Sequence, residues 1–400
     1  MRGTWVCALL VCGCCWMVAP RRVGAVPQEK ATQSKVAQSK VNGPGAAAAS
    51  QGRDFASLVK KAEEARLADH SEEAERLYKQ LVRRKPNFVE GWWYLGTLYY
   101  ESDQYAEGRD AFRRVSGLKP DMALAWAMLG LCEFETKNYD SALAHLDRAD
   151  QLKIPAGSEF YDVARYHLAL LLIRAGRFEL AIRVISDFAR QEKDTPQLVE
   201  AMGLAGLRKP LLPNELPPLE REMVLDVGRA LCDTAARRPA NIERDRDILL
   251  QKYPNTPEVH FLAGETWLAS DSDKAIDEWK KELVISPSHT QALASLAGEY
   301  LKRSDYQTAL PYADRAVESS TNYFTAHAIL GQILTQGDID VARGVRELEA
   351  AVHLAPMQPQ VHFALATAYA KAGRKEDAAK ERAEFLRLRG ENEVAASKPQ

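Results

Sequence analysis

The chain has 400 residues, of which 46% are hydrophobic and 27% are charged, and its formal net charge is −2. This composition is that of an ordinary globular protein and gives no sign of overall disorder. The lack of a basic excess also argues against a nucleic-acid partner. The length suffices for one extended array of repeats or for two domains.

An apolar run from Trp5 to Ala19 follows Arg2 and precedes the small residues 23–25. This order is typical of a secretory signal peptide, so we expect residues 1–25 to be removed by cleavage after Ala25. We therefore expect a periplasmic or secreted protein, and a bacterial one because the chain has no Asn-x-Ser/Thr acceptor. Contact with a membrane is expected only if the segment stays uncleaved or if Cys14 carries a lipid.

Removing residues 1–25 would take away three arginines and no acid, which leaves 50 basic and 55 acidic residues. Four of the six cysteines lie in the same segment. The other two, Cys132 and Cys232, are too few for a disulfide framework. They either pair with each other in an oxidising compartment or, as we expect, are two small core residues.

After the predicted signal, residues 26–52 contain no aromatic side chain and end in Gly-Pro-Gly and small residues, which predicts a flexible spacer. A helical period then begins, and it is clearest in residues 88–120. That stretch contains one apolar stripe on each of two helices, two glycines that allow the helices to approach closely, and a proline that ends the second helix. The pattern consists of Trp92-x-x-Leu95-Gly96-x-x-Tyr99, Gly108-x-x-x-Phe112 and Pro120.

Small residues equivalent to Gly96 recur along the chain and divide it into blocks. We expect an N-terminal block over 53–208, a proline-rich loop over 209–218 that no helix crosses, a C-terminal block over 219–390 and a tail over 391–400. The two blocks should fold separately, with the loop as a hinge or as a protease-sensitive strap. The recurring small residues are Ala62, Gly96, Gly130, Ala169, Gly228, Gly264, Ala297, Gly331 and Ala366.

These units, about eight or nine in phase over residues 54–389, resemble the tetratricopeptide-repeat family. The resemblance implies an all-α fold, a right-handed α-solenoid of stacked helix-turn-helix repeats whose concave groove binds a protein or peptide segment. The groove positions of the family, carried over to this chain, predict six partner-binding residues: Trp93, Thr97, Tyr100, Phe134, Tyr166 and Arg174. Equivalent positions nearer the C-terminus form a more polar surface: Phe261, Glu265, Gln291, Lys302, Gln332, Gln336, Phe363, Thr367 and Lys371. Any one of these side chains has an alternative role, which is to pack against a neighbouring repeat.

No sequence motif of nucleotide, metalloprotease or hydrolase chemistry is found. His260, His327 and His362 recur where earlier repeats have Trp92 and Trp126, but adjacent repeats are too far apart to share a zinc ion. We therefore expect no catalytic, cofactor or metal site, and a non-enzymatic scaffold that binds protein and no nucleic acid. The alternatives are a structural subunit of a cell-envelope or secretion complex and, less favoured, an enzyme with its site on the proline-rich loop.

Overall fold

The computed structural model describes residues 44–397, with side chains from 52 to 391. Within these residues the regular elements are all helices, which confirms the all-α expectation. The predicted signal peptide and residues 26–43 of the predicted spacer lie outside the described part. None of the helices between Pro44 and Ser397 has both the length and the apolar composition that crossing a bilayer requires.

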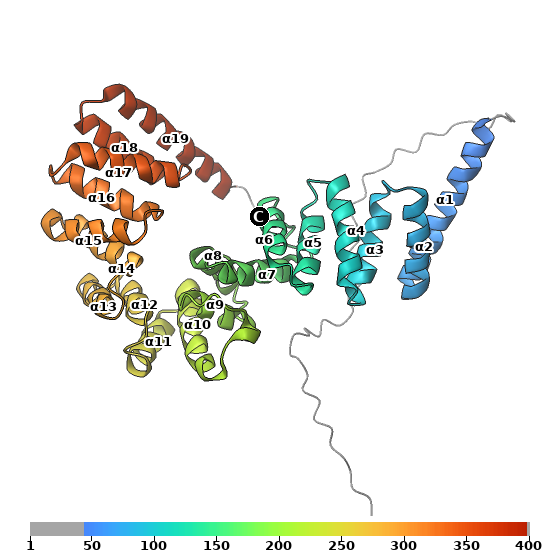
Figure 1. Cartoon of the computed structure of the whole chain (residues 1–400), viewed down its shortest axis with the longest axis horizontal. Helices are drawn as coiled ribbons and strands as arrows, with labels where there is room; N and C mark the ends of the chain where they lie inside the picture. Colours follow the sequence, from blue (N-terminus) through green and yellow to red (C-terminus); the bar gives the residue numbers. More distant parts are fainter. Residues whose placement is uncertain (1–43, 398–400) are drawn as a thin grey trace, which may run out of the picture. The chain divides into compact units, whose positions relative to one another are not determined.

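The chain divides into two compact units, residues 1–168 and 169–400, and the division falls within helix α7 (Tyr161–Arg174). In the first unit consecutive helices pack in pairs, α1 on α2, α3 on α4 and α5 on α6. Figure 1 shows these helices in blue to green. Their bounds are α1 (Pro44–Leu67), α2 (Ser71–Arg84), α3 (Val89–Glu101), α4 (Tyr105–Leu118), α5 (Ala123–Glu135) and α6 (Tyr139–Gln151).

Helix α1 begins at Pro44, inside the segment that we expected to be a spacer. Proline is favoured in the first turn of a helix, and the alanines that follow it have the highest helix propensity of any residue. The small residues at 45–49 therefore extend the first helix instead of forming a linker.

The glycines of the clearest repeat have the packing role that the sequence predicts. A Cβ atom added to Gly96 would lie 2.9 Å from the ring of Phe112, which is fully buried between α3 and α4. In the next repeat an added Cβ on Gly130 would lie 2.7 Å from Leu146. Each first helix thus has a small residue where a large side chain of the second helix inserts.

The second unit continues the pairwise arrangement from α12 onward, and the pairs are α12 with α13, α14 with α15, α16 with α17 and α18 with α19. Before them, α9 packs on α10, and α10 packs on α11. The bounds are α8 (Phe178–Arg190), α9 (Pro196–Gly206), α10 (Arg221–Ala235), α11 (Pro239–Lys252), α12 (Val259–Trp267), α13 (Ser272–Ile285), α14 (Thr290–Lys302), α15 (Tyr306–Ser319), α16 (Phe324–Gln336), α17 (Val341–Leu354), α18 (Pro359–Lys371) and α19 (Lys375–Ser397).

The proline-rich segment 209–218 lies inside the second unit, whereas we expected a boundary there. No α-helix crosses it, as predicted, but two 3₁₀ turns, Pro213–Glu215 and Pro218–Glu220, give it a defined course. Leu212 and Leu216 are buried, so the segment contributes to the core. The expected hinge is therefore a packed connection in this structure.

The helices on either side of this segment are in backbone contact, which explains why they belong to one unit. A Cβ atom added to Gly203 of α9 would lie 1.8 Å from the carbonyl oxygen of Val224 in α10. One added to Gly228 of α10 would lie 1.9 Å from the carbonyl oxygen of Val199. Only glycine fits at these two positions, because any side chain would separate the helices.

Candidate functional site

Two of the six predicted partner-binding residues are buried within the first unit. Trp93 is 3% exposed and packs edge-on against Phe112, with the ring centroids 5.5 Å apart. Thr97 is also 3% exposed, and its hydroxyl donates a hydrogen bond to the carbonyl oxygen of Tyr94 at 2.9 Å. Both side chains are buried in this structure, so their contact with a partner stays a prediction that burial does not favour.

The three aromatic residues of the prediction, Tyr100, Phe134 and Tyr166, are half-buried and already have aromatic neighbours. The ring of Tyr100 lies 6.4 Å from that of Phe160, and the ring of Phe134 lies 4.6 Å from that of His167. Tyr166 contacts His167 as well, at 5.5 Å. Burial raises the pKa of Tyr100 and lowers the pKa of His167, as expected of groups with little water around them. Phe160 and His167 therefore cover much of the predicted aromatic surface.

The sixth predicted residue, Arg174, holds the proline-rich segment in place. Its guanidinium donates to both carboxylate oxygens of Glu215 at 2.9 Å. Glu215 in turn accepts a hydrogen bond from the backbone amide of Leu212 at 2.8 Å. This contact of one guanidinium nitrogen with both carboxylate oxygens gives Arg174 a structural role.

Polar contacts also connect the middle of the second unit. Glu179 of α8 accepts hydrogen bonds from Arg208 at 2.7 Å and from Gln291 of α14 at 2.6 Å. Close by, the buried Glu258 contacts His289 at 3.0 Å. These contacts join helices far apart in the sequence, and they engage Gln291, which we expected to face a partner.

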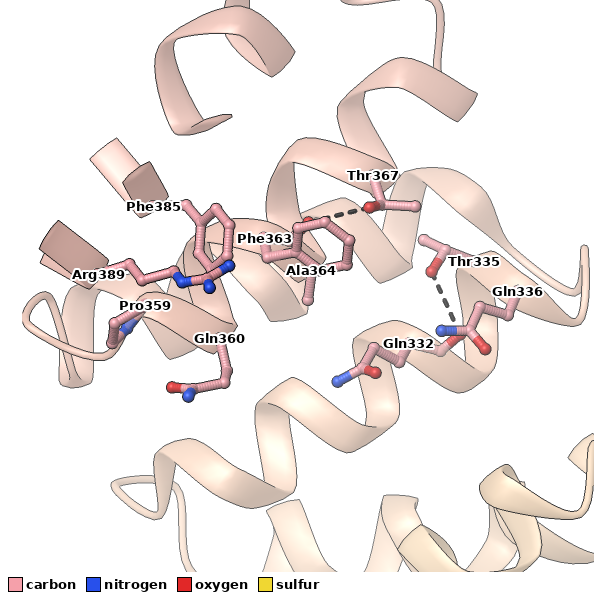
Figure 2. Close-up of a pocket in the computed structure, with 10 residues that line it drawn as sticks. All are labelled: Gln332, Thr335, Gln336, Pro359, Gln360, Phe363, Ala364, Thr367, Phe385 and Arg389. Atoms are coloured by element: carbon pink, nitrogen blue, oxygen red, sulfur yellow. Dashed lines mark hydrogen bonds between the residues drawn. The ribbon is translucent and has the colours of Figure 1, made fainter. Parts of the chain in front are cut away.

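A hollow of about 760 Å³ lies between α16, α18 and the middle of α19. It brings together four predicted groove positions, Gln332, Gln336, Phe363 and Thr367, and α19 adds Phe385 and Arg389 (Figure 2). The volume is within the range of known ligand sites. We take this hollow as the candidate functional site.

Phe363 is the most unusual residue of the hollow, because 55% of this large aromatic side chain is exposed. Its ring lies 5.3 Å from that of Phe385, and the two rings come from different helices. Leu386, which follows Phe385 on α19, is also exposed. Aromatic side chains that stay exposed in a concave surface are typical anchors for a protein partner.

The three recurring histidines have a shared structural role that the sequence did not reveal. In each, Nε2 donates to a backbone carbonyl six residues earlier, and Nδ1 contacts a glutamate of the paired helix. Since a carbonyl oxygen can only accept, Nε2 carries a hydrogen. The contact between Nδ1 and the glutamate then needs a second proton, either on Nδ1 or on the carboxyl group. The Nε2 bonds are His260 to Pro254 at 2.8 Å, His327 to Thr321 at 3.1 Å and His362 to Pro356 at 2.8 Å; the Nδ1 partners are Glu278, Glu347 and Glu381, at 2.5, 2.7 and 2.6 Å.

The glutamate partners were missed, although a signal for them exists in the sequence. Each lies 18 to 20 residues after its histidine, at one place in the second helix of the repeat. Among the residues that the structure describes, no group of three or more His, Cys, Asp or Glu side chains is arranged to hold a metal ion.

Cys132 and Cys232 are both buried, and each has a free thiol. Burial raises the pKa of each thiol to about 12. The structure thus has two small core residues at these positions, as expected, and not a disulfide.

Comparison with known proteins agrees with the repeat pattern. The sequence profile of the tetratricopeptide repeat matches residues 59–115, 95–156 and 334–393. Cellulose synthase operon protein C of Xanthomonas axonopodis pv. citri is 29% identical over 155 residues, and BBSome complex member BBS4 of Bos taurus is 34% identical over 86. These matches cover 36% and 21% of this chain but only 10% and 17% of the relatives, so the chain matches a small part of each.

Among solved structures, a crystal structure of MamA matches this chain with 20% identity and a TM-score of 0.36. The match covers 41% of this chain and 96% of the MamA chain. MamA from Desulfovibrio magneticus RS-1 gives 21% identity and a TM-score of 0.38, with 42% of this chain and 94% of that chain covered.

Proposed function

Since the chain belongs to the tetratricopeptide-repeat family, we propose that it is a non-enzymatic scaffold that binds a segment of another protein in the hollow between α16, α18 and α19. The observation that carries the proposal is the 55% exposure of Phe363 inside this hollow. A large aromatic side chain in water loses the free energy that burial would supply, and a partner that covers it recovers that free energy.

The rest of the predicted groove offers less to a partner. In the first unit the aromatic residues contact Phe160 and His167, and in the second unit Gln291 and Arg174 are held by Glu179 and Glu215. A partner would have to displace these contacts. At the hollow it would meet an aromatic surface that is already open.

Photo-crosslinking tests where the partner binds. The benzophenone amino acid p-benzoylphenylalanine would replace Phe363 in one variant and Val284 in another, both in the native host. Val284 is the matched control, because it is 82% exposed and lies outside the hollow. Discrete adducts from position 363 and none of the same mass from position 284 would support the proposal. Equal labelling from both positions, or none from 363, would contradict it.

The same adducts distinguish a scaffold from a structural subunit. A scaffold gives adducts with a soluble protein in less than equimolar amount. A subunit of an envelope or secretion complex gives equimolar adducts that stay with the membrane fraction.

We further propose that the scaffold acts in the periplasm or outside the cell, on the basis of the apolar run from Trp5 to Ala19 and the small residues before Val26. Intact-mass measurement of the protein from its native host tests this. A chain that begins at Val26 agrees with export, whereas a chain that retains residues 1–25 without modification contradicts cleavage.

A further inference from the structure

Within the described residues no helix pair follows α18 and α19, and this last pair ends in an apolar surface. Phe363 of α18 is 55% exposed and Leu386 of α19 is 64% exposed. The ring of Phe385, which precedes Leu386, lies 5.3 Å from that of Phe363 (Figure 2). We call these three residues the terminal surface. The last helix of a repeat array normally has a polar outer face, so exposed apolar side chains there indicate a binding surface.

Leu386 has a counterpart in each of the three preceding second helices, α13, α15 and α17. Each counterpart is the twelfth residue of its helix, as Leu386 is of α19. Each is half-buried against a core cluster that includes residues of the next first helix, which is α14, α16 or α18. The counterparts are Leu283, Val317 and Val352. Elsewhere in the array, the position of Leu386 therefore receives the first helix of the following repeat.

The counterparts of Phe363 on preceding first helices are covered in the same way. Each lies three residues before the recurring small residue of its repeat, as Phe363 does. Ala294 of α14 is buried in one cluster with Ala326 of α16, and Ala328 of α16 is buried in another with Val361 of α18. Phe363 is exposed because its repeat is the last one described.

The repeat of α12 and α13 shows how a phenylalanine and a leucine at these two positions are covered. Phe261 and Leu283 stand there where the last repeat has Phe363 and Leu386. The ring of Phe261 lies 4.8 Å from that of His289, the residue before α14, and Leu283 packs against a cluster that contains residues of α14. An α-helix is therefore the element that covers such a pair in this array.

The helices that dock at these positions share a pair of apolar residues. The first residue of the pair is alanine or valine, the second is a leucine four positions later, and both are buried. The pairs are Ala292 with Leu296 in α14, Ala326 with Leu330 in α16, and Val361 with Leu365 in α18. Residues four positions apart lie on the same face of a helix. We expect a helix that covers the terminal surface to have the same pair.

Helix α1 lacks this pair, which favours a partner protein over a second copy of this chain. The equivalent positions of α1 hold Ser57 and Lys61, and both side chains are exposed. Burying these polar groups against phenylalanine and leucine would cost free energy. In α14, α16 and α18 of a second copy, the apolar pair is already buried within that copy's own array.

We infer that the terminal surface binds an amphipathic α-helix of another protein, which packs on α18 and α19 as α18 packs on α16 and α17. The bound helix places a small or β-branched residue, and a leucine four positions later, against Phe363, Phe385 and Leu386. This inference rests on the proposed function, since it names the class of segment that would bind at Phe363.

Selection from a phage-displayed library of random peptides on the full chain tests this inference. Peptides of about sixteen residues are long enough for about four helical turns. Enriched sequences would be synthesised with a fluorescent label, and their affinity would be measured by anisotropy. We expect them to contain a small or β-branched residue followed four positions later by leucine. A proline placed between the two should weaken binding by more than about tenfold, because it breaks the helix.

Two substitutions in the chain test the surface. Leu386→Asp should weaken binding of the enriched peptides by more than about tenfold, because it places a charge under the docked helix, and Phe363→Ala should do the same by removing an aromatic anchor. Val284→Asp is the matched control, because Val284 is exposed on α13 and lies outside the terminal surface. Circular dichroism checks that the helices are retained. Sedimentation velocity measures self-association of the unchanged chain and of Leu386→Asp.

The outcomes separate the inference from the proposed function. Peptides that depend on Phe363 but tolerate the proline, lack the apolar pair or bind equally to Leu386→Asp would overturn the inference and leave the proposed function standing. Self-association that Leu386→Asp abolishes would also overturn it, because the occupant would then be a second copy. If no selected peptide depends on Phe363, both are wrong. Peptides with the pair, sensitive to the proline and to both substitutions but not to Val284→Asp, would support both.

Discussion

His362 donates a hydrogen bond from Nε2 to the carbonyl oxygen of Pro356 at 2.8 Å, six residues earlier in the chain. Trp92 makes the same bond from its indole nitrogen to Pro86 at 2.8 Å, and Trp126 makes it to Pro120 at 2.9 Å. Tryptophan and histidine share this position because both offer a ring N–H directed at the chain that enters the first helix. The recurrence of histidine thus has a structural cause.

Removing this donor should destabilise the second unit. His362→Ala leaves the Pro356 carbonyl and Glu381 without their partner, and loss of a buried hydrogen bond costs about 1–3 kcal/mol of the free energy of unfolding. His353→Ala is the control, because His353 is exposed on α17. Urea unfolding followed by circular dichroism measures both. Equal urea midpoints for His362→Ala and His353→Ala would show that the hydrogen bond contributes nothing to the free energy of unfolding.

The backbone contact between α9 and α10 predicts a strong effect of a single methyl group. Gly203→Ala should lower the free energy of unfolding of the second unit by on the order of 3 kcal/mol, because the new Cβ atom would overlap the Val224 carbonyl. Gly298→Ala on α14 is the control, since its Cβ atom would meet only Ile329, at 3.4 Å. Thermal unfolding of the two variants makes the comparison. If Gly203→Ala does not lower the stability, α9 and α10 lie farther apart than in this structure.

The proline-rich segment should resist proteolysis. Leu212 and Leu216 are buried, and Glu215 is bound by Arg174, so the backbone of 209–218 cannot extend into a protease without local unfolding. Brief digestion with proteinase K, followed by mass spectrometry, should give no cut there. The double variant Leu212→Ala, Leu216→Ala should become sensitive, which shows that the assay detects exposure. Rapid cutting of the unchanged chain within residues 209–218 would show that this segment is exposed, in agreement with the hinge that the sequence predicts.

Trp93→Ala should affect stability and not partner binding. Truncating a buried tryptophan costs about 3–5 kcal/mol, and Trp93 packs against Phe112 in the core of its repeat. Leu67→Ala, at an exposed position of α1, should change little. Chemical unfolding of the first unit measures both. A Trp93→Ala chain of unchanged stability would indicate that this side chain is exposed after all.

The two cysteines should be unreactive in the folded protein. Both thiols are buried and their pKa is raised to about 12, so at pH 8 almost none of either is the reactive thiolate. In a chain expressed without residues 1–25, Ellman's reagent should detect no thiol before unfolding and both thiols after it. Failure to detect them in denaturant without reductant would instead reveal a disulfide.

The repeat architecture could be predicted because one local pattern specifies it. The recurrence of Gly96 and Gly130, with a tryptophan four positions before each, marks helix pairs that must stack, and these contacts are local in sequence. The direction of individual side chains was harder to predict. Trp92 and Trp93 differ by one position on α3, and only the neighbouring helices decide which of them is fully buried.

The repeat pattern also predicted part of the lining of the candidate site. Gln332, Gln336, Phe363 and Thr367 follow from the repeat pattern, but Phe385 and Arg389 lie on α19, a second helix that the pattern assigns to the outside of the array. In the first unit, residues near the start of α7 cover Tyr100 and Phe134, and a contact of this range has no signature in a single repeat. Tertiary packing therefore decides which of the groove positions stay open.

The ring N–H bonds to carbonyls six residues earlier also fix the length of the connection between one repeat and the next. One extra residue between Pro356 and His362, or between Pro120 and Trp126, would move the donor away from its acceptor. The chain has a longer connection before α7, and there the equivalent position holds Arg165, which pairs with Asp150 at 3.3 Å. Length variation among relatives, and any epitope inserted for labelling, should therefore be tolerated in the connection before α7. Neither should be tolerated in connections where a tryptophan or histidine makes this hydrogen bond.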